Sequence, residues 1–133
     1  MKQHITIEQI NELSKNGKER LRKWWKPKNG DIYSNEGEQE IFHFPCAGEY
    51  CAMEGKTKMT YPSGLQVKFY PLLSIGQMIE FLDEHASQFV LDYGTSEFGE
   101  WQKHWRLIFD ENQYECDELC DALWEACKEV LEK

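Results

Sequence analysis

The sequence predicts an α+β fold in which helices pack on one face of a small, mostly antiparallel sheet. Three stretches favour this fold: an apolar helical stripe over residues 70–85, two strand-like runs within residues 59–70, and a longer helical face over residues 116–131. The chain of 133 residues has the length of one domain, and we expect residues 1–133 to form a single domain.

Two short helices are expected at the N-terminus. Thr6 and Gln9 have the spacing of a capping box, and a short apolar stripe follows them. A second helix should span residues 18–25 and end before Pro27, because the residue before a proline avoids the α conformation. The segments expected next are residues 31–33 (strand), 35–39 (loop), 41–44 (strand) and 46–58 (loop).

A hairpin and a central helix are expected in the middle of the chain. Pro62 and Gly64 have turn chemistry between two runs of strand-forming residues. Ser74 and Gln77 repeat the capping-box spacing before the apolar stripe that includes Met78. The later segments expected are residues 89–91 (strand), 94–99 (loop), 104–109 (strand) and 116–131 (a C-terminal helix with acidic residues at its start).

Five cysteines raise the question of metal or thiol chemistry. Cys116, Cys120 and Cys127 fall on the apolar side of the C-terminal helix, so we favour core thiols there. His43, Cys46 and Cys51 are candidate zinc ligands, but they lack the usual CxxC spacing. The sequence contains no Walker A loop, no dinucleotide fingerprint and no known cysteine-enzyme signature. We therefore expect a protein that is not an enzyme and that has no catalytic residue and no cofactor. A thiol- or zinc-dependent enzyme is the least favoured alternative.

A basic stretch near the N-terminus has the composition of a nucleic-acid footprint. It contains two tryptophans, Trp24 and Trp25, which could stack on bases. Alternatively the tryptophans dock this helix on the core, and the cations form its solvated face. The candidate nucleic-acid-binding residues are Lys18, Arg20, Arg22, Lys23 and Lys26.

The net charge of −9 is unevenly distributed along the chain. Residues 1–28 hold eight Lys/Arg and three Glu, a net +5, so the other 105 residues carry −14. Residues 80–100 have six acids and no Lys or Arg, and these acids could mimic phosphates toward a basic partner or simply confer solubility. The candidate partner-binding acids are Glu80, Asp83, Glu84, Asp92, Glu97 and Glu100.

Three blocks of sequence, ITIEQINEL, YPLLSIGQMIEFLDE and ELCDALWEACKEVLE, resemble small accessory proteins carried by phages and prophages of Firmicutes. The resemblance implies a phage-encoded protein expressed in the cytoplasm of a bacterium, with no assigned activity to transfer. By analogy it implies binding to a host protein, such as a CRISPR nuclease, without fixing the oligomeric state. Residues 35–59 and 94–105, including Trp101, lie outside the resemblance.

No stretch of the sequence approaches the roughly 20 apolar residues of a membrane span, and the N-terminus has no apolar signal region. We therefore expect a cytoplasmic protein with no membrane partner.

Overall fold

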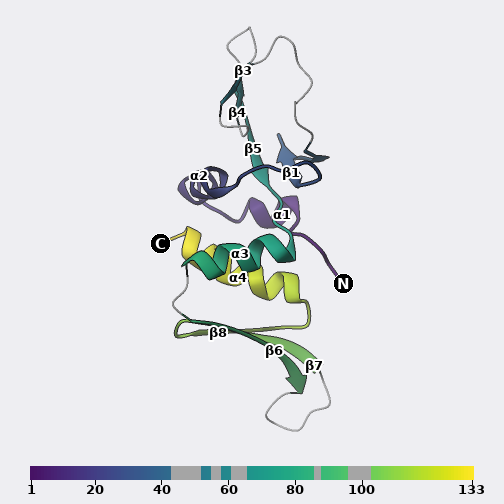
Figure 1. The fold of residues 1–133 in the computed structure, drawn as a ribbon, viewed down its shortest axis with the longest axis vertical. Helices are drawn as coiled ribbons and strands as arrows, with labels where there is room; N and C mark the ends of the chain where they lie inside the picture. The colour runs from purple at the N-terminus through teal and green to yellow at the C-terminus, as the bar shows by residue number, and fades with distance from the viewer. Residues whose placement is uncertain (43–51, 55–57, 61–65, 86–87, 96–102) are drawn as a thin grey trace. The chain divides into compact units, whose positions relative to one another are not determined.

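The computed structural model describes residues 1–42, 52–54, 58–60, 66–85, 88–95 and 103–133 (Figure 1). It confirms the α+β class, with two antiparallel sheets in place of the one expected. Contacts divide the chain into unit 1, residues Met1–Ile5 and Leu73–Lys133, and unit 2, residues Thr6–Leu72. The expectation of a single domain stays a prediction.

Unit 2 contains two short helices and a five-stranded sheet in the order β2-β1-β5-β4-β3. Its elements are α1 (Ile7–Ile10), α2 (Lys15–Trp24), β1 (Ile32–Asn35), β2 (Glu38–Ile41), β3 (Ala52–Glu54), β4 (Lys58–Thr60) and β5 (Gln66–Pro71). The predicted hairpin is confirmed, since β4 pairs antiparallel with β5; its turn lies outside the described residues. The expected loop over residues 46–58 is wrong in part, because β3 lies within it and pairs with β4.

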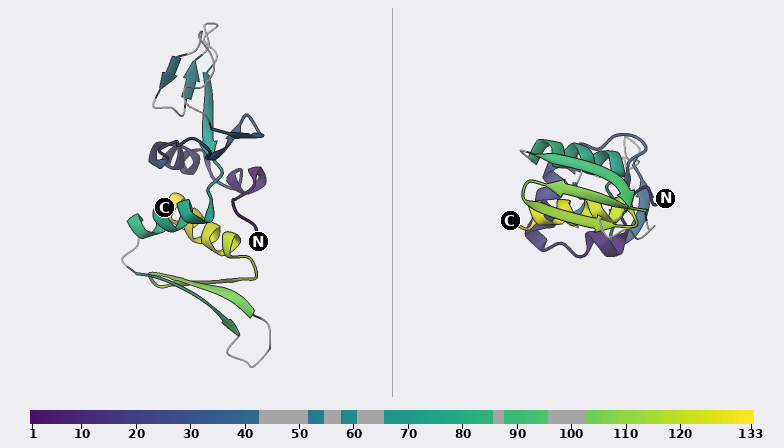
Figure 2. Two further views of the ribbon diagram at one scale, coloured as in Figure 1. Left: turned by 45° about the vertical axis from the view of Figure 1, so that its right-hand side comes forward. Right: turned by 90° about the horizontal axis from the view of Figure 1, so that it is seen from below.

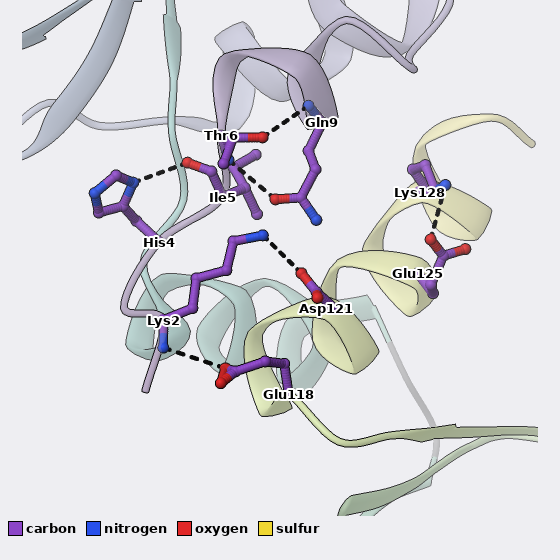
Figure 3. Close-up of polar contacts among 9 residues, drawn as sticks. All are labelled: Lys2, His4, Ile5, Thr6, Gln9, Glu118, Asp121, Glu125 and Lys128. Atoms are coloured by element: carbon purple, nitrogen blue, oxygen red, sulfur yellow. Dashed lines mark hydrogen bonds and ion pairs between the residues drawn. The ribbon is translucent and has the colours of Figure 1, made fainter.

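Both helices of unit 2 begin at side-chain caps. The predicted capping box is confirmed: Gln9 N donates to Thr6 Oγ1 at 3.2 Å, and Thr6 N donates to Gln9 Oε1 at 3.0 Å (Figure 3). Helix α2 begins three residues earlier than predicted, because Ser14 Oγ accepts the Gly17 backbone N–H at 3.1 Å. Ser14 is therefore the N-cap of α2.

The expected loop over residues 35–39 is wrong, because β1 and β2 form a tight hairpin there. Asn35 pairs with Glu38, so only Glu36 and Gly37 form the turn. Both have positive φ, 51° and 87°, as a type I′ turn requires. The strand expected over residues 41–44 starts earlier, as β2, and His43 and Phe44 lie outside the described residues.

The core of unit 2 is aromatic. Trp25, Tyr33, Phe42, Val67 and Phe69 are buried together, and the aromatic rings contact one another at centroid distances of 5.0–6.1 Å. The Trp25 indole N–H donates to Asp31 at 3.0 Å, which satisfies its one polar group. The C-terminal end of α2 is thus fixed by packing of the indole between the helix and the sheet.

Unit 1 is a three-stranded sheet, in the order β6-β7-β8, with two helices on one face (Figures 1 and 2). Its elements are α3 (Ile75–His85), β6 (Phe89–Thr95), β7 (Lys103–Phe109), β8 (Asn112–Cys116) and α4 (Leu119–Leu131). The central helix is confirmed as α3, with the predicted cap: Ser74 N donates to Gln77 Oε1 at 2.9 Å, and Gln77 N donates to Ser74 Oγ at 3.1 Å.

Helix α4 forms the centre of unit 1. It contacts β7, β8 and α3, and eight of its thirteen residues are buried. It begins at Leu119 and not at Cys116, because residues 112–116 pair with β7 as β8. The first residues of the chain complete the unit: Ile5 N donates to Leu73 O at 3.0 Å, and Ile75 N donates to Gln3 O at 3.1 Å.

Candidate interaction surfaces

The two units differ in net charge. Unit 1 has 15 Asp/Glu and five Lys/Arg, a formal charge of −10, whereas unit 2 has nine Asp/Glu and ten Lys/Arg, a charge of +1. All of the net negative charge of the protein therefore belongs to unit 1. The strongest candidate interaction surface is accordingly sought among the acidic side chains of that unit.

Three of the six predicted partner-binding acids lie together on α3. Glu80, Asp83 and Glu84 are exposed, while Met78 and Phe81 on the opposite side of the helix are buried. No Lys or Arg is present in α3. These three acids thus place like charges together on the exposed side of α3, and we call them the α3 acidic surface.

Asp92 occupies a different layer of unit 1. The buried Leu107 of β7 faces the helices, so Asp92 and its cross-strand neighbour Arg106 project from the opposite face of the sheet. Arg106 Nη2 lies 2.6 Å from Asp92 Oδ2, and the pair offsets one negative charge. Glu97 and Glu100, the remaining two predicted acids, lie outside the described residues.

Helix α4 adds an acidic stripe that our sequence analysis did not propose as an interaction surface. Its members follow one another at intervals of three or four residues, which places them on one side of the helix. They are Glu118, Asp121, Glu125, Glu129 and Glu132. The same spacing is visible in the sequence, where these acids alternate with the apolar face of the predicted helix.

Several contacts partly neutralise the α4 stripe. The backbone N–H of Lys2 donates to Glu118 Oε2 at 3.2 Å, and Lys2 Nζ lies 2.8 Å from Asp121 Oδ1 (Figure 3). Lys128 Nζ lies 2.9 Å from Glu125 Oε1. These contacts tie the N-terminal segment to α4, so part of this stripe has a structural role.

The candidate nucleic-acid-binding cations of α2 are divided between structural and exposed positions. Lys18 Nζ donates to Asn11 Oδ1 at 3.0 Å and lies 5.9 Å from the centre of the Tyr70 ring. Arg22 pairs with Glu19 at 2.7 Å. Arg20, Lys23 and Lys26 are exposed.

The two tryptophans of the basic stretch pack inward. Trp25 is only 4% exposed, and Trp24 is partly buried against the same aromatic cluster. Trp25 therefore presents no open face for stacking on a base, and packing against the cluster covers part of Trp24.

Glu19 connects α2 to β5 in unit 2. Its carboxylate accepts hydrogen bonds from Arg22, from Lys68 Nζ at 2.9 Å and from Tyr70 Oη at 3.2 Å. The hydrogen bonds from Arg22, which outweigh the effect of burial, lower the pKa of Glu19 from 4.5 to about 2. Burial, with the adjacent Glu19 charge, raises the pKa of Tyr70. Arg22 is thus committed to this network.

Two of the three C-terminal cysteines are core residues, as predicted. Cys120 and Cys127 are fully buried in α4, and burial raises the pKa of Cys120 to about 11 and that of Cys127 well above its usual range. Cys116 differs from the prediction: it lies in β8 and is partly exposed, with a pKa raised mainly by burial. All three are therefore protonated, weakly nucleophilic thiols at neutral pH.

Within the described part of the chain, no three His, Cys, Asp or Glu side chains come together as a group that could hold a metal ion. The candidate zinc ligands His43, Cys46 and Cys51 lie outside that part. A surface hollow of about 410 Å³ at the β7–β8 turn is lined by Gln88, Asp110, Glu111, Asn112 and Lys133. These polar side chains include no thiol, hydroxyl or imidazole that could act as a nucleophile or a neutral-pH base.

The fold and surfaces define a small α+β protein with an acidic unit. No known family model, curated protein or solved structure matches the chain. Among the described residues, no helix has both the length and the apolar character needed to cross a membrane.

Proposed function

We propose that the protein is a non-enzymatic binding protein whose acidic unit 1 docks on a basic surface of a macromolecular partner. The observation that supports this proposal best is the charge of −10 on unit 1, with exposed acids of uniform sign on α3. Such a surface accelerates encounter with a basic partner and repels nucleic acids, which compete for the same partner.

The resemblance to phage accessory proteins suggests the setting. We propose that a phage expresses the protein in the bacterial cytoplasm and that the partner is a host nucleic-acid-binding defence protein, such as a CRISPR nuclease. The acidic surface would then occupy a basic groove that otherwise holds a phosphate backbone.

The test is affinity capture of the tagged protein from its host, followed by measurement of affinity for the captured partner. Replacing Asp83 and Glu84 by lysine should weaken binding about tenfold or more, because it reverses the sign of the α3 acidic surface. A matched control replaces Glu36 and Glu38, two exposed acids of unit 2, by lysine, which changes net charge equally. Equal loss of affinity in both variants, or no loss in either, would contradict the proposal.

A nucleic-acid-binding regulator is the second candidate, supported by one observation. Arg20, Lys23 and Lys26 are exposed and recur every three residues over the second half of α2 and just beyond its end. A gel-shift assay with short duplex and single-stranded DNA tests this candidate. Absence of a salt-sensitive shift at micromolar protein would exclude it. Metal analysis of protein purified without a histidine tag tests the least favoured alternative, the zinc-dependent enzyme.

A further inference from the structure

Strand β6 forms one edge of the sheet in unit 1. It pairs with β7 at seven consecutive positions, from Phe89 opposite Phe109 to Thr95 opposite Lys103, with no bulge. Among the described strands, none pairs with the other side of β6. A regular edge strand presents a row of backbone N–H and C=O groups that can pair with a further strand.

Two residue types that commonly protect a sheet edge are missing from the sequence of β6. It contains no lysine and no proline, the residues that most often block further pairing. Two of the four exposed large apolar side chains in the described residues belong to it: Val90, 51% exposed, and Tyr93, 52% exposed. The opposite edge strand, β8, has the more polar sequence NQYEC.

The outer face of β6 combines an apolar and an acidic residue. Val90 lies opposite Ile108, and Asp92 lies opposite Arg106, which in turn lies opposite Glu115 of β8. The second row therefore contains two acids and one cation. A strand added beside β6 would place its side chains about 5 Å from those of Val90 and Asp92, close enough for an apolar contact and a new ion pair.

We propose that β6 binds an extended, basic segment of the partner protein by antiparallel or parallel strand addition. The segment places an apolar side chain beside Val90 and, two residues along, a Lys or Arg beside Asp92. This inference rests on the proposed function and specifies the docking surface and the chemistry of its occupant. A basic segment fits this edge better than a second copy of the chain does. Pairing of two β6 strands would bring two units of charge −10 together, and like charges repel.

The first test uses two synthetic peptides of equal charge, Lys-Val-Lys-Lys-Lys-Val-Lys and Lys-Pro-Lys-Lys-Lys-Pro-Lys, with the full-length protein. In the valine peptide, one face carries valine and, two residues along, lysine, in both strand directions. Fluorescence anisotropy should show that the valine peptide binds about tenfold more tightly, because proline lacks the N–H that strand addition needs. Equal affinity for the two peptides, or no binding of the valine peptide, would overturn the proposal.

The second test uses Val90→Glu. This change adds a negative charge, which should strengthen a purely electrostatic complex with the valine peptide. Strand addition instead predicts about a fivefold loss of affinity, because the apolar contact and the β preference of valine are removed. The matched control is Gln113→Glu in the same cross-strand row on the opposite edge, which should not weaken binding.

The two proposals fail in different ways. If the captured partner binds Val90→Glu normally but loses affinity for the Asp83→Lys, Glu84→Lys variant, the strand-addition inference is wrong and the acidic binding function stands. If no salt-sensitive partner is captured but Val90→Glu still weakens the valine peptide, strand addition stands and the proposed function is wrong. Sedimentation that reveals a dimer abolished by Val90→Glu would overturn the proposed occupant in favour of a second copy.

Discussion

Replacing Glu19 by glutamine is expected to destabilise unit 2, because it removes the charge that joins α2 to β5. Glu19 accepts hydrogen bonds from Arg22 at 2.7 Å, Lys68 at 2.9 Å and Tyr70 at 3.2 Å. The lowering of its pKa from 4.5 to about 2 corresponds to at most about 3 kcal/mol. Since the Glu19 side chain is 22% exposed and solvent screens the ion pairs, we expect a loss of about 1–2 kcal/mol at neutral pH.

The pH dependence of this loss is fixed by the direction of the pKa shift. A carboxyl whose pKa is lowered by folding stabilises the protein above pH 4.5 and loses that contribution as pH falls toward 2. Urea unfolding followed by tryptophan fluorescence should therefore show a difference between wild type and Glu19→Gln at pH 7 that narrows at about pH 3. Glu38→Gln, at an exposed position of β2, is the control. A difference below about 0.5 kcal/mol at pH 7, or one that is unchanged in acid, would refute the reasoning.

Three further changes test local features of the fold. Glu36→Asn should raise the free energy of unfolding by about 0.5–1 kcal/mol, because asparagine tolerates a φ of 51° better than glutamate does. Calorimetry should therefore show a higher Tm, and an unchanged or lower Tm would contradict the type I′ turn. Tyr114→Phe should leave the free energy of unfolding in urea unchanged or raise it by up to about 1 kcal/mol, since the buried hydroxyl has no hydrogen-bond partner among the described residues. A decrease in the free energy of unfolding would contradict this expectation, because it would mean that the hydroxyl has a hydrogen-bond partner. Cys120 and Cys127 should resist alkylation in the native state and react rapidly in urea, as read by mass spectrometry of each cysteine; rapid native labelling would contradict their burial.

Much of the helical structure is predictable from the sequence because its signals are local. The capping pairs Thr6/Gln9 and Ser74/Gln77 form as their spacing indicates. The apolar stripe of residues 75–82 predicts α3 for the same reason, since a helix repeats its own pattern within one segment.

Two polar edge strands are among the elements that the sequence does not predict. Strands β2 (EQEI) and β8 (NQYEC) contain few apolar residues, so they lack the alternation by which a half-buried strand is recognised. They are strands because each pairs with a neighbour, β1 or β7, across a two-residue turn. Missing β8 also placed Cys116 in the helix, although it is the last residue of that strand.

The candidate surfaces depended on tertiary information that composition cannot supply. Of the acids of residues 80–100 that the structure describes, three lie on the exposed side of α3 and Asp92 lies on the outer face of the sheet, where Arg106 offsets its charge. The division of the chain into a unit of charge −10 and a unit of charge +1 follows the contacts and not the order of residues, since Met1–Ile5 belongs with the C-terminal half.

The central claim is that the acidic unit binds a basic partner through its charge. The most direct measurement is the dissociation constant of the purified complex with the captured partner, determined from about 50 mM to about 200 mM salt. The account predicts that affinity falls steeply with salt for the wild-type protein and that the Asp83→Lys, Glu84→Lys variant shows a smaller slope. An affinity that does not change with salt, or an identical slope in the variant, would contradict it.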